Sequence, residues 1–167
     1  MIQRLALYYK SEKGKMSMAS IKKILCAVDF SERSYNALEQ AVVLAKQSDA
    51  ELHLVHVVSK PRNLEDYQQC ACSLVEHIEA RMILDSYVKL SAIIEERIPK
   101  AVKSKLTIRQ GDAATEIIRS AQKESADMIV LGTQERKGWR RFLASSVAHR
   151  VIQQAVCPVV TIQAAQH

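Results

Sequence analysis

One stretch of the chain, LGTQERKGWRRFLASSVA at residues 131–148, holds the residues best suited to bind a ligand, because it joins an apolar strand to a basic loop and a helix start. Such loops hold phosphate groups, since the first amides of a helix lack intrahelical partners and the helix dipole favours negative charge. Ser145 and Ser146 stand at the expected helix start, where their hydroxyls can donate to a phosphate. Gly132 allows a ligand to approach the backbone closely. The stretch indicates a nucleotide loop, either working or vestigial.

A second polar position follows the first buried strand. Residues 24–28, ILCAV, form an apolar run closed by Asp29, after which Ser31 can cap a helix. Ligands of open α/β sheets bind beyond the carboxyl ends of strands, where the strand order reverses. If the strands before Asp29 and Gly132 are neighbours, one pocket gains a carboxylate for a base or ribose and a glycine for close approach. Asp29 could instead brace its own loop, Gly132 only permit a turn, and Ser146 be an ordinary helix cap.

Strands and helices alternate around these positions. A helical pattern, YNALEQAVVLAKQ, follows Ser31, and ELHLVHVV at residues 51–58 is typical of a buried strand. In order, there follow a long helix over about residues 64–98, a strand at residues 105–109, a helix capped by Asp112, the strand MIVLG, the helix SVAHRVIQQA and the strand VVTIQ. Five strands alternating with four helices predict a parallel sheet with helices on both faces.

Length and composition suit one domain. The chain has 167 residues, of which 48% are hydrophobic and 25% charged, and single domains commonly hold ~100 to 200 residues. No apolar run approaches the ~20 residues that a membrane span requires. The N-terminal segment has a broken apolar patch and no clear cleavage site, which makes it a poor secretory signal. We expect residues 1–19 to be a flexible extension, residues 20–167 to form the domain, and the protein to be cytoplasmic.

The positive charge of the chain is unevenly distributed. Lys and Arg number 24 against 18 Asp and Glu, a net charge of +6, and residues 1–19 supply +3 of it from four basic residues and one acidic residue. A second basic cluster consists of Arg136, Lys137, Arg140 and Arg141 around Trp139. It could serve phosphate, nucleic acid or water. A solvated loop is the default interpretation, so nucleic acid is not an expected partner.

No constellation of residues indicates catalysis or metal binding. The sequence shows no nucleophile with a recognisable base. His53 and His56 are three apart on a strand and so face opposite sides of the sheet. Cys70 and Cys72 are two apart in a helical pattern and so point to different faces, which makes a poor metal pair. We therefore expect no metal site and no enzyme, although weak ATP hydrolysis stays open.

In their order along the chain, three segments resemble the universal stress protein family: IKKILCAVDFSERSYNAL, AELHLVHVV and IVLGTQERKGWRRFLASSVAHRVIQQAVCPVVTI. The resemblance extends from Ile21 to Gln163. It implies a three-layer α/β/α fold of the adenine nucleotide alpha hydrolase-like kind, whose five parallel strands have the order 3-2-1-4-5, so that the first and fourth strands are neighbours. It also implies a homodimer whose last strands meet, here through Val159, Val160, Thr161 and Ile162.

Nucleotide-binding members of that family carry a glycine, two residues, a second glycine, nine residues, a third glycine, and then Ser or Thr. The spacing is kept here, with Gly132 at the first glycine and Ser146 at the closing hydroxyl, but Glu135 and Ser145 replace the other two glycines. A carboxylate about 4 Å from a phosphate charge costs roughly 4 kcal/mol at an effective dielectric constant near 20, before screening. Ser145 adds a Cβ where the backbone would lie close to phosphate.

The resemblance also implies which residues a retained site would use. They are Asp29, Leu52, Leu131, Gly132, Thr133, Ser145, Ser146 and Val147, with Asp29 and Leu52 around the adenine and ribose. The leading hypothesis is a dimeric cytoplasmic stress-response module with a degenerate nucleotide pocket and unidentified protein partners. The alternative is a competent ATP or AMP sensor, with Mg²⁺ if ATP binds. An ATP hydrolase or transferase is less favoured, since two glycines are replaced and no catalytic base is visible.

Overall fold

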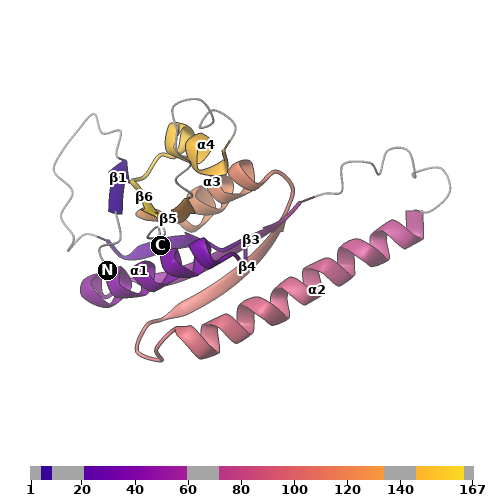
Figure 1. Cartoon of the computed structure of the whole chain (residues 1–167), viewed down its shortest axis with the longest axis horizontal. Coiled ribbons are helices and arrows are strands. Elements are labelled where there is room, and N and C mark those ends of the chain that lie inside the picture. Colours follow the sequence, from indigo (N-terminus) through magenta and orange to yellow (C-terminus); the bar gives the residue numbers. More distant parts are fainter. Residues whose placement is uncertain (1–4, 9–20, 60–71, 134–145, 164–167) are drawn as a thin grey trace.

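A sheet of six strands forms the middle layer of the protein (Figure 1). The computed structural model describes residues 5–8, 21–59, 72–133 and 146–163. The strands are β1 (Leu5–Tyr8), β2 (Lys23–Ala27), β3 (Glu51–Val58), β4 (Ser104–Gln110), β5 (Met128–Thr133) and β6 (Val159–Gln163). Their order is β1-β6-β5-β2-β3-β4, with β1 antiparallel to β6 and every other pair parallel. The predicted order 3-2-1-4-5 is confirmed, because it corresponds to β4-β3-β2-β5-β6.

Four helices cover the sheet, two on each face (Figure 1). Their bounds are α1 (Glu32–Ser48), α2 (Cys72–Arg97), α3 (Ala113–Glu124) and α4 (Val147–Gln154). Side chains of α1 and α2 pack in one core and those of α3 and α4 in the other. The long helix predicted over about residues 64–98 is confirmed from Cys72 to Arg97, and its first turns, residues 64–71, lie outside the described residues. No helix in the described ranges has both the length and the apolar character needed to cross a membrane.

Successive residues of each central strand supply the two cores alternately, as strand geometry requires. Ile24 and Cys26 of β2 face α1 and α2, whereas Leu25 between them faces α3 and α4. Since both faces of the sheet are covered, these strands are continuous apolar runs. Val160 and Ile162 of β6 are also buried on the side of α1 and α2. The side chains predicted for the dimer contact are therefore core residues, and only the backbone edge of β6 could pair with a partner strand, an edge that β1 occupies in this structure.

Residues 5–8 form a strand that the sequence did not predict. We expected all of residues 1–19 to be a flexible extension, but β1 runs antiparallel to β6, with Leu5 opposite Ile162 and Tyr8 opposite Val159. The physical reason is the unpaired row of amides and carbonyls that β6 would otherwise present at the end of the sheet. For residues 5–8 the expectation is corrected. Residues 1–4 and 9–19 lie outside the described residues, and the domain boundary stays a prediction.

Three helices begin at the same edge of the sheet, because each of them follows the carboxyl end of a parallel strand. The predicted caps hold their first turns: Ser31 Oγ accepts a hydrogen bond from the Ser34 amide at 3.3 Å, and Asp112 Oδ1 accepts one from the Thr115 amide at 3.0 Å. Ser146 caps α4 in the same way. The N-termini of α1, α3 and α4 therefore gather where a ligand of this class of sheet binds.

Candidate functional site

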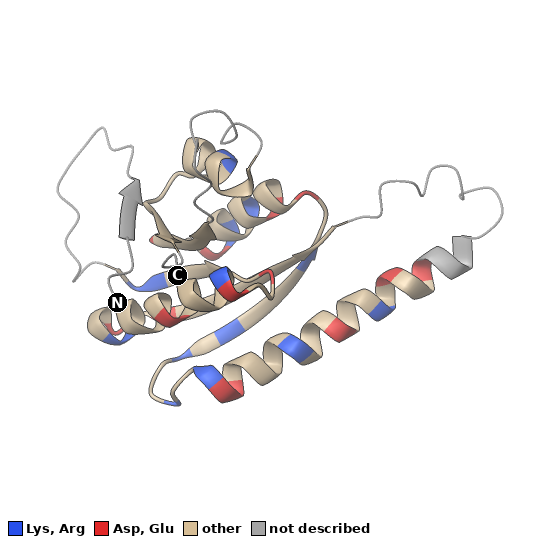
Figure 2. Ribbon diagram, in the orientation of Figure 1, with Lys and Arg blue, Asp and Glu red and all other residues tan. Residues whose placement is uncertain are grey.

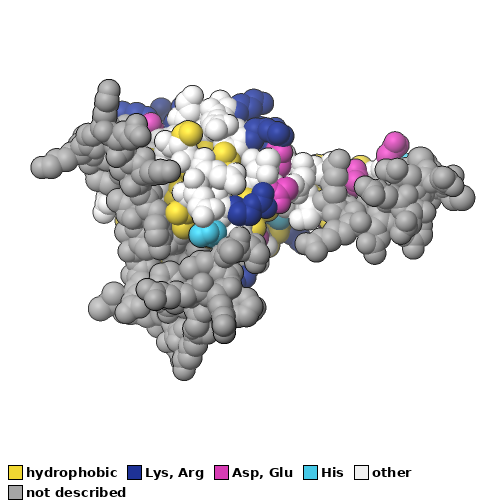
Figure 3. Space-filling view, turned by 90° about the horizontal axis from the view of Figure 1, so that it is seen from above, with side chains coloured by type: hydrophobic (Ala, Val, Ile, Leu, Met, Phe, Trp, Pro, Cys, Tyr) yellow, Lys and Arg dark blue, Asp and Glu magenta, His cyan; other side chains and the backbone are white. Residues whose placement is uncertain are grey.

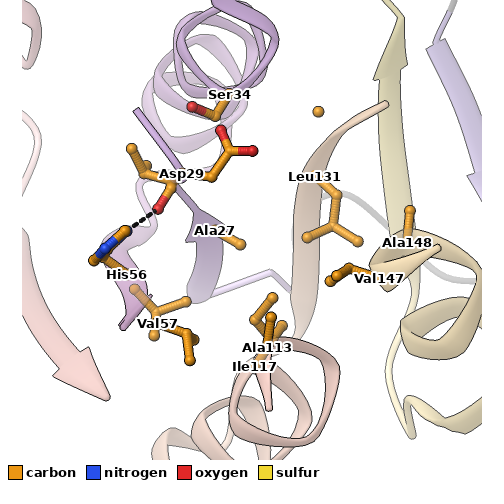
Figure 4. A pocket seen from close by; sticks show the side chains of 13 residues that line it. Ala27, Asp29, Ser34, His56, Val57, Ala113, Ile117, Leu131, Val147 and Ala148 are labelled. Atoms are coloured by element: carbon orange, nitrogen blue, oxygen red, sulfur yellow. Dashed lines mark hydrogen bonds between the residues drawn. The ribbon is translucent and has the colours of Figure 1, made fainter. Parts of the chain in front are cut away.

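A pocket lies where the strand order reverses. β2 and β5 are adjacent, with Cys26 opposite Val130, and the chain continues from β2 to β3 on one side and from β5 to β6 on the other. The carboxyl ends of β2, β3 and β5 form its floor, and the first turns of α1, α3 and α4 form its walls (Figure 4). The structure thus brings together the two strand ends that the sequence singled out, those before Asp29 and Gly132.

The walls of the pocket are largely apolar. The side chains of Leu131 from β5, Ile117 from α3 and Val147 from α4 point into the same space, and Asp29 and Ser34 lie at another side (Figure 4). The cavity volume is about 130 Å³, whereas pockets for drug-sized ligands measure ~300 to 1,000 Å³. The described part of the pocket is therefore smaller than a typical site for a drug-sized ligand.

The carboxylate of Asp29 braces the turn between β2 and α1. Its Oδ1 accepts hydrogen bonds from the amide of Ser31, at 3.0 Å, and from the hydroxyl of the same residue. Burial favours the neutral acid, but hydrogen bonds from Ser31 and Ser34 and the charge of Arg33 outweigh it, so the pKa of Asp29 lies below its ordinary value. The carboxylate of Asp29 is thus stabilised by groups of its own turn, independently of any ligand.

The turn after Asp29 has an unusual backbone. Phe30 has a φ of 62°, a left-handed conformation that bulky residues seldom adopt. Its ring stacks on His56 with centroids 4.3 Å apart, and the Nδ1–H of His56 donates to the Val28 carbonyl at 2.7 Å. Lys89 Nζ of α2 lies 5.6 Å from the centroid of the Phe30 ring. Side chains from β3 and α2 therefore hold this turn beside the pocket in its strained form.

Gly132 fits against the backbone of α1. A Cβ at this position would lie 2.4 Å from the carbonyl oxygen of Arg33 and 2.9 Å from the amide nitrogen of Ser34. Both are backbone atoms, so a side chain here would force β5 and α1 apart. The packing of strand on helix is sufficient to require glycine at this position, with or without a ligand.

The first turn of α4 supplies the remaining wall. Ser146 Oγ accepts a hydrogen bond from the His149 amide at 3.1 Å, and the amides of Val147 and Ala148 belong to the turn that has no intrahelical acceptors. An ion pair between Arg150 and Asp112 ties α4 to α3. Figure 3 shows basic and acidic side chains side by side on the surface above these helices. The described start of α4 is therefore held in place, and its first amides are of the kind that can bind an anion.

The structure brings together half of the predicted binding residues. Asp29, Leu131, Gly132 and Val147 line the pocket. Thr133 directly follows Gly132, and Ser146 directly precedes Val147, but neither is among the lining residues. Ser145 and the motif departure Glu135 lie outside the described residues. The part of the motif that is described thus forms one wall of a real pocket.

Leu52, which the resemblance places near the adenine, is not among the residues that line the pocket. Leu52 lies at the amino end of β3, opposite Ile24, and is fully buried in the core on the side of α1 and α2. The part of β3 that reaches the pocket is its carboxyl half, Val55, His56 and Val57. The signal for them was present in the sequence, since the rule that ligands lie beyond the carboxyl ends of strands selects residues late in ELHLVHVV.

The two histidines of β3 face opposite sides of the sheet, as predicted. His53 Nε2 lies 2.8 Å from Thr107 Oγ1, and His53 Nδ1 lies 3.7 Å from Glu124 of α3. His56 instead packs on Phe30, on the side of α2. Within the described ranges, no three His, Cys, Asp or Glu side chains gather in a way that could hold a metal ion.

The fold and the pocket define a doubly wound α/β protein with a pocket at the reversal of strand order. A model of the universal stress protein family matches residues 20–163, and the chain belongs to that family. Universal stress protein MJ0531 of Methanocaldococcus jannaschii is 32% identical over 142 residues, which are 85% of this chain and 82% of that protein.

Solved structures share this arrangement. That of hypothetical protein MJ0577 superposes with a TM-score of 0.69 at 23% identity, and covers 88% of this chain and 99% of that one. A universal stress protein from Archaeoglobus fulgidus in complex with dAMP gives a TM-score of 0.53 at 22% identity, with 86% of this chain and 98% of that one covered. At these identities the likeness extends to the fold.

Proposed function

We propose that this protein is a regulatory module of the stress response, a cytoplasmic homodimer that acts through protein partners and whose nucleotide pocket is degenerate. In this proposal the protein is not an enzyme. The pocket keeps the shape of a site for an adenine nucleotide but holds ATP or AMP weakly or not at all. The basic cluster at residues 136–141, outside the described residues, serves solvation and not nucleic acid.

The role of Gly132 is the observation that carries the proposal. Its Cβ would lie 2.4 Å from the carbonyl oxygen of Arg33, so helix packing requires a glycine here. The one glycine of the family motif that is retained at its place is therefore explained without a nucleotide. The other two motif positions are Glu135 and Ser145, which is the pattern expected when the fold is maintained and the ligand is not.

The preserved part of the pocket indicates which ligand the site would take if it took one. Apolar walls from Leu131, Ile117 and Val147 suit the faces of a purine ring, and the start of α4 suits a phosphate. The similar structure from Archaeoglobus fulgidus contains dAMP. Mg²⁺ would enter only with ATP, because the described residues offer it no cluster of ligands.

Titration calorimetry with ATP and with AMP, in the presence of Mg²⁺, tests the proposal. We expect no micromolar binding by the natural chain and a gain of binding in Glu135→Gly/Ser145→Gly. A matched variant, Glu135→Ala/Ser145→Ala, removes the carboxylate without restoring the freedom of glycine. It separates charge repulsion from backbone shape as the cause. Micromolar binding by the natural chain would contradict the proposal and favour a competent nucleotide sensor.

A further inference from the structure

The two edges of the sheet are protected in different ways. β4 forms one edge, where every residue is half-exposed and Lys105 and Arg109 add charge; Figure 2 shows basic residues along this strand. Charged residues on an edge strand discourage pairing with another chain. β6 has no charged residue, and Val159, Val160, Thr161 and Ile162 are all buried. The edge at β6 therefore depends on a strand to cover it.

In this chain that strand is β1. It lies at the end of the sheet and pairs with β6 alone (Figure 1). A ladder of four residues gains few hydrogen bonds, while each residue that is ordered loses conformational entropy. Pairing of β1 with β6 is therefore the contact in this sheet that is most easily reversed.

The direction of the β6 amides shows where a competing strand would bind. The amide of Ile129 in β5 donates to the Pro158 carbonyl at 2.9 Å, and Ile129 lies opposite Val159. Backbone groups alternate in direction along a strand, so the amides of Val160 and Ile162 point to β5. Those of Val159, Thr161 and Gln163 point to β1. Ala6 stands opposite Thr161 and is the central position of the contact.

We propose that β1 controls self-association, because it occupies from within the same chain the β6 edge that the dimer of the proposed function would use. The inference rests on the dimer of the proposed function and adds a mechanism that regulates its formation. β1 and a partner's β6 would use the same outward amides, so the two contacts exclude each other. Release of β1 is therefore the step that permits dimerisation.

The tether favours the internal contact at low protein concentration. Twelve residues, 9–20, connect Tyr8 to Ile21, a length of chain that reaches up to roughly 40 Å when extended. The path from β1 past β6 and β5 to β2 crosses three strand spacings, roughly 14 Å. A strand on such a tether has an effective concentration in the millimolar range. A second copy at micromolar concentration competes only when β1 is weakened.

Ala6→Pro tests the competition in the full-length chain, because proline removes the amide opposite Thr161. Ala6→Val is the matched control, since it keeps that amide and favours a strand. In amide hydrogen exchange at low concentration, we expect faster exchange within Val159–Gln163 for Ala6→Pro than for Ala6→Val. Equal exchange in the two variants would overturn the inference.

Sedimentation velocity over a concentration series supplies the second readout. We expect the dimer dissociation constant of Ala6→Pro to be at least tenfold lower than that of Ala6→Val. Adding Thr161→Pro, which removes an outward amide of β6, should abolish the gain. Gln163→Pro, at the end of the strand, replaces it if circular dichroism shows that Thr161→Pro does not fold.

The experiments distinguish an error in the competition by β1 from an error in the proposed dimer. If the natural chain is already a dimer through β6 and Ala6→Pro does not change its dissociation constant, the dimer is supported and competition by β1 is overturned. Self-association that survives the β6 prolines overturns the β6 edge as the surface. If Ala6→Pro loses protection in β6 yet stays monomeric at high concentration, both the competition and the dimer are wrong.

Discussion

The guanidinium of Arg150 forms two hydrogen bonds with the carboxylate of Asp112, Nη1 to Oδ2 at 2.8 Å and Nη2 to Oδ1 at 2.7 Å. The same carboxylate caps α3 through the Thr115 amide. One side chain therefore fixes the start of α3 and ties α4 to it. Since Ala113 of α3 and Val147 of α4 both line the pocket, this contact sets the spacing between two of its walls.

Substitutions of Asp112 separate its two roles. Asp112→Asn keeps a good N-cap and loses the charge pair, whereas Asp112→Ala loses both. We expect the alanine variant to lose about 1 kcal/mol of unfolding free energy from the cap, and the asparagine variant to lose less, because an exposed ion pair contributes little. Urea denaturation at neutral pH measures both. Equal losses in the two variants would show that the cap contributes nothing.

The same carboxylate predicts a dependence on pH. Hydrogen bonds from Arg150 and then Thr115 hold the pKa of Asp112 far below its ordinary value. A carboxyl with a depressed folded-state pKa stabilises the fold above its unfolded value, near 3.9, and this contribution falls as the pH drops below it. The natural chain should lose more stability between pH 5 and pH 3 than Asp112→Asn does. Parallel curves for the two proteins would contradict this.

Gly132→Ala should destabilise the protein strongly. The added Cβ meets backbone atoms of Arg33, which cannot move without shifting α1. Overpacking of this kind costs about 1 to 3 kcal/mol, and we expect at least ~2 kcal/mol in urea denaturation without any nucleotide. Thr133→Ala, at the adjacent half-exposed position, is the control and should cost less than ~1 kcal/mol. Natural stability in Gly132→Ala would remove the packing explanation for the retained glycine.

His53 should make the fold sensitive to mild acid. Burial lowers its pKa, and the charge of Lys105 adds to this, against the opposing effect of Glu124. Because the unfolded chain binds this proton first, the stability from neutral His53 is complete above pH ~6.5 and is lost as the pH falls through the folded value, by at most ~1.4 kcal/mol per pH unit.

Unfolding in urea at pH 7, 6 and 5 measures this effect. His53→Gln should show a smaller decline than the natural chain, since glutamine takes up no proton. The exposed His77 of α2 offers the control His77→Gln for loss of an imidazole as such. An unchanged decline in His53→Gln would show that other groups cause the acid sensitivity.

Cys26 should resist thiol reagents in the folded protein. Burial raises its pKa to about 12, and burial of Cys157 raises that pKa to about 11. In a Cys70→Ser/Cys72→Ser background, these two are the remaining thiols of the four in the chain. At pH 8, we expect Cys26 to react only on unfolding and Cys157, which is half-exposed, to react sooner. Rapid labelling of native Cys26, located by mass spectrometry, would refute this.

The central fold could be predicted because its signals are local. Apolar runs of strand length, each followed by a capping residue such as Ser31 or Asp112, specify where strands end and helices begin. Because strands alternate with helices along the chain, and the helices must cover both faces of the sheet, a parallel sheet is the expected arrangement. The strand order came from the resemblance to a family. The meeting of Asp29 with Gly132 then followed, because those strands are neighbours.

What could not be predicted depends on contacts distant in the sequence. LALY at residues 5–8 is only a short apolar run, and its pairing depends on the edge of β6, which is distant in the sequence. Leu52 was assigned to the adenine by correspondence with a family position, whereas the register of β3 places Val55 and His56 at the pocket. The packing role of Gly132 required the position of the Arg33 carbonyl.

The close fit of Gly132 under the Arg33 carbonyl also has a mechanical meaning. β5 and the first turn of α1 meet backbone to backbone, so they cannot move closer together. α3 and α4 are joined across the pocket by the exposed pair of Asp112 and Arg150. A change in the shape of the pocket is therefore accommodated more readily by α3 and α4, which side-chain contacts hold, than by the backbone contact between β5 and α1.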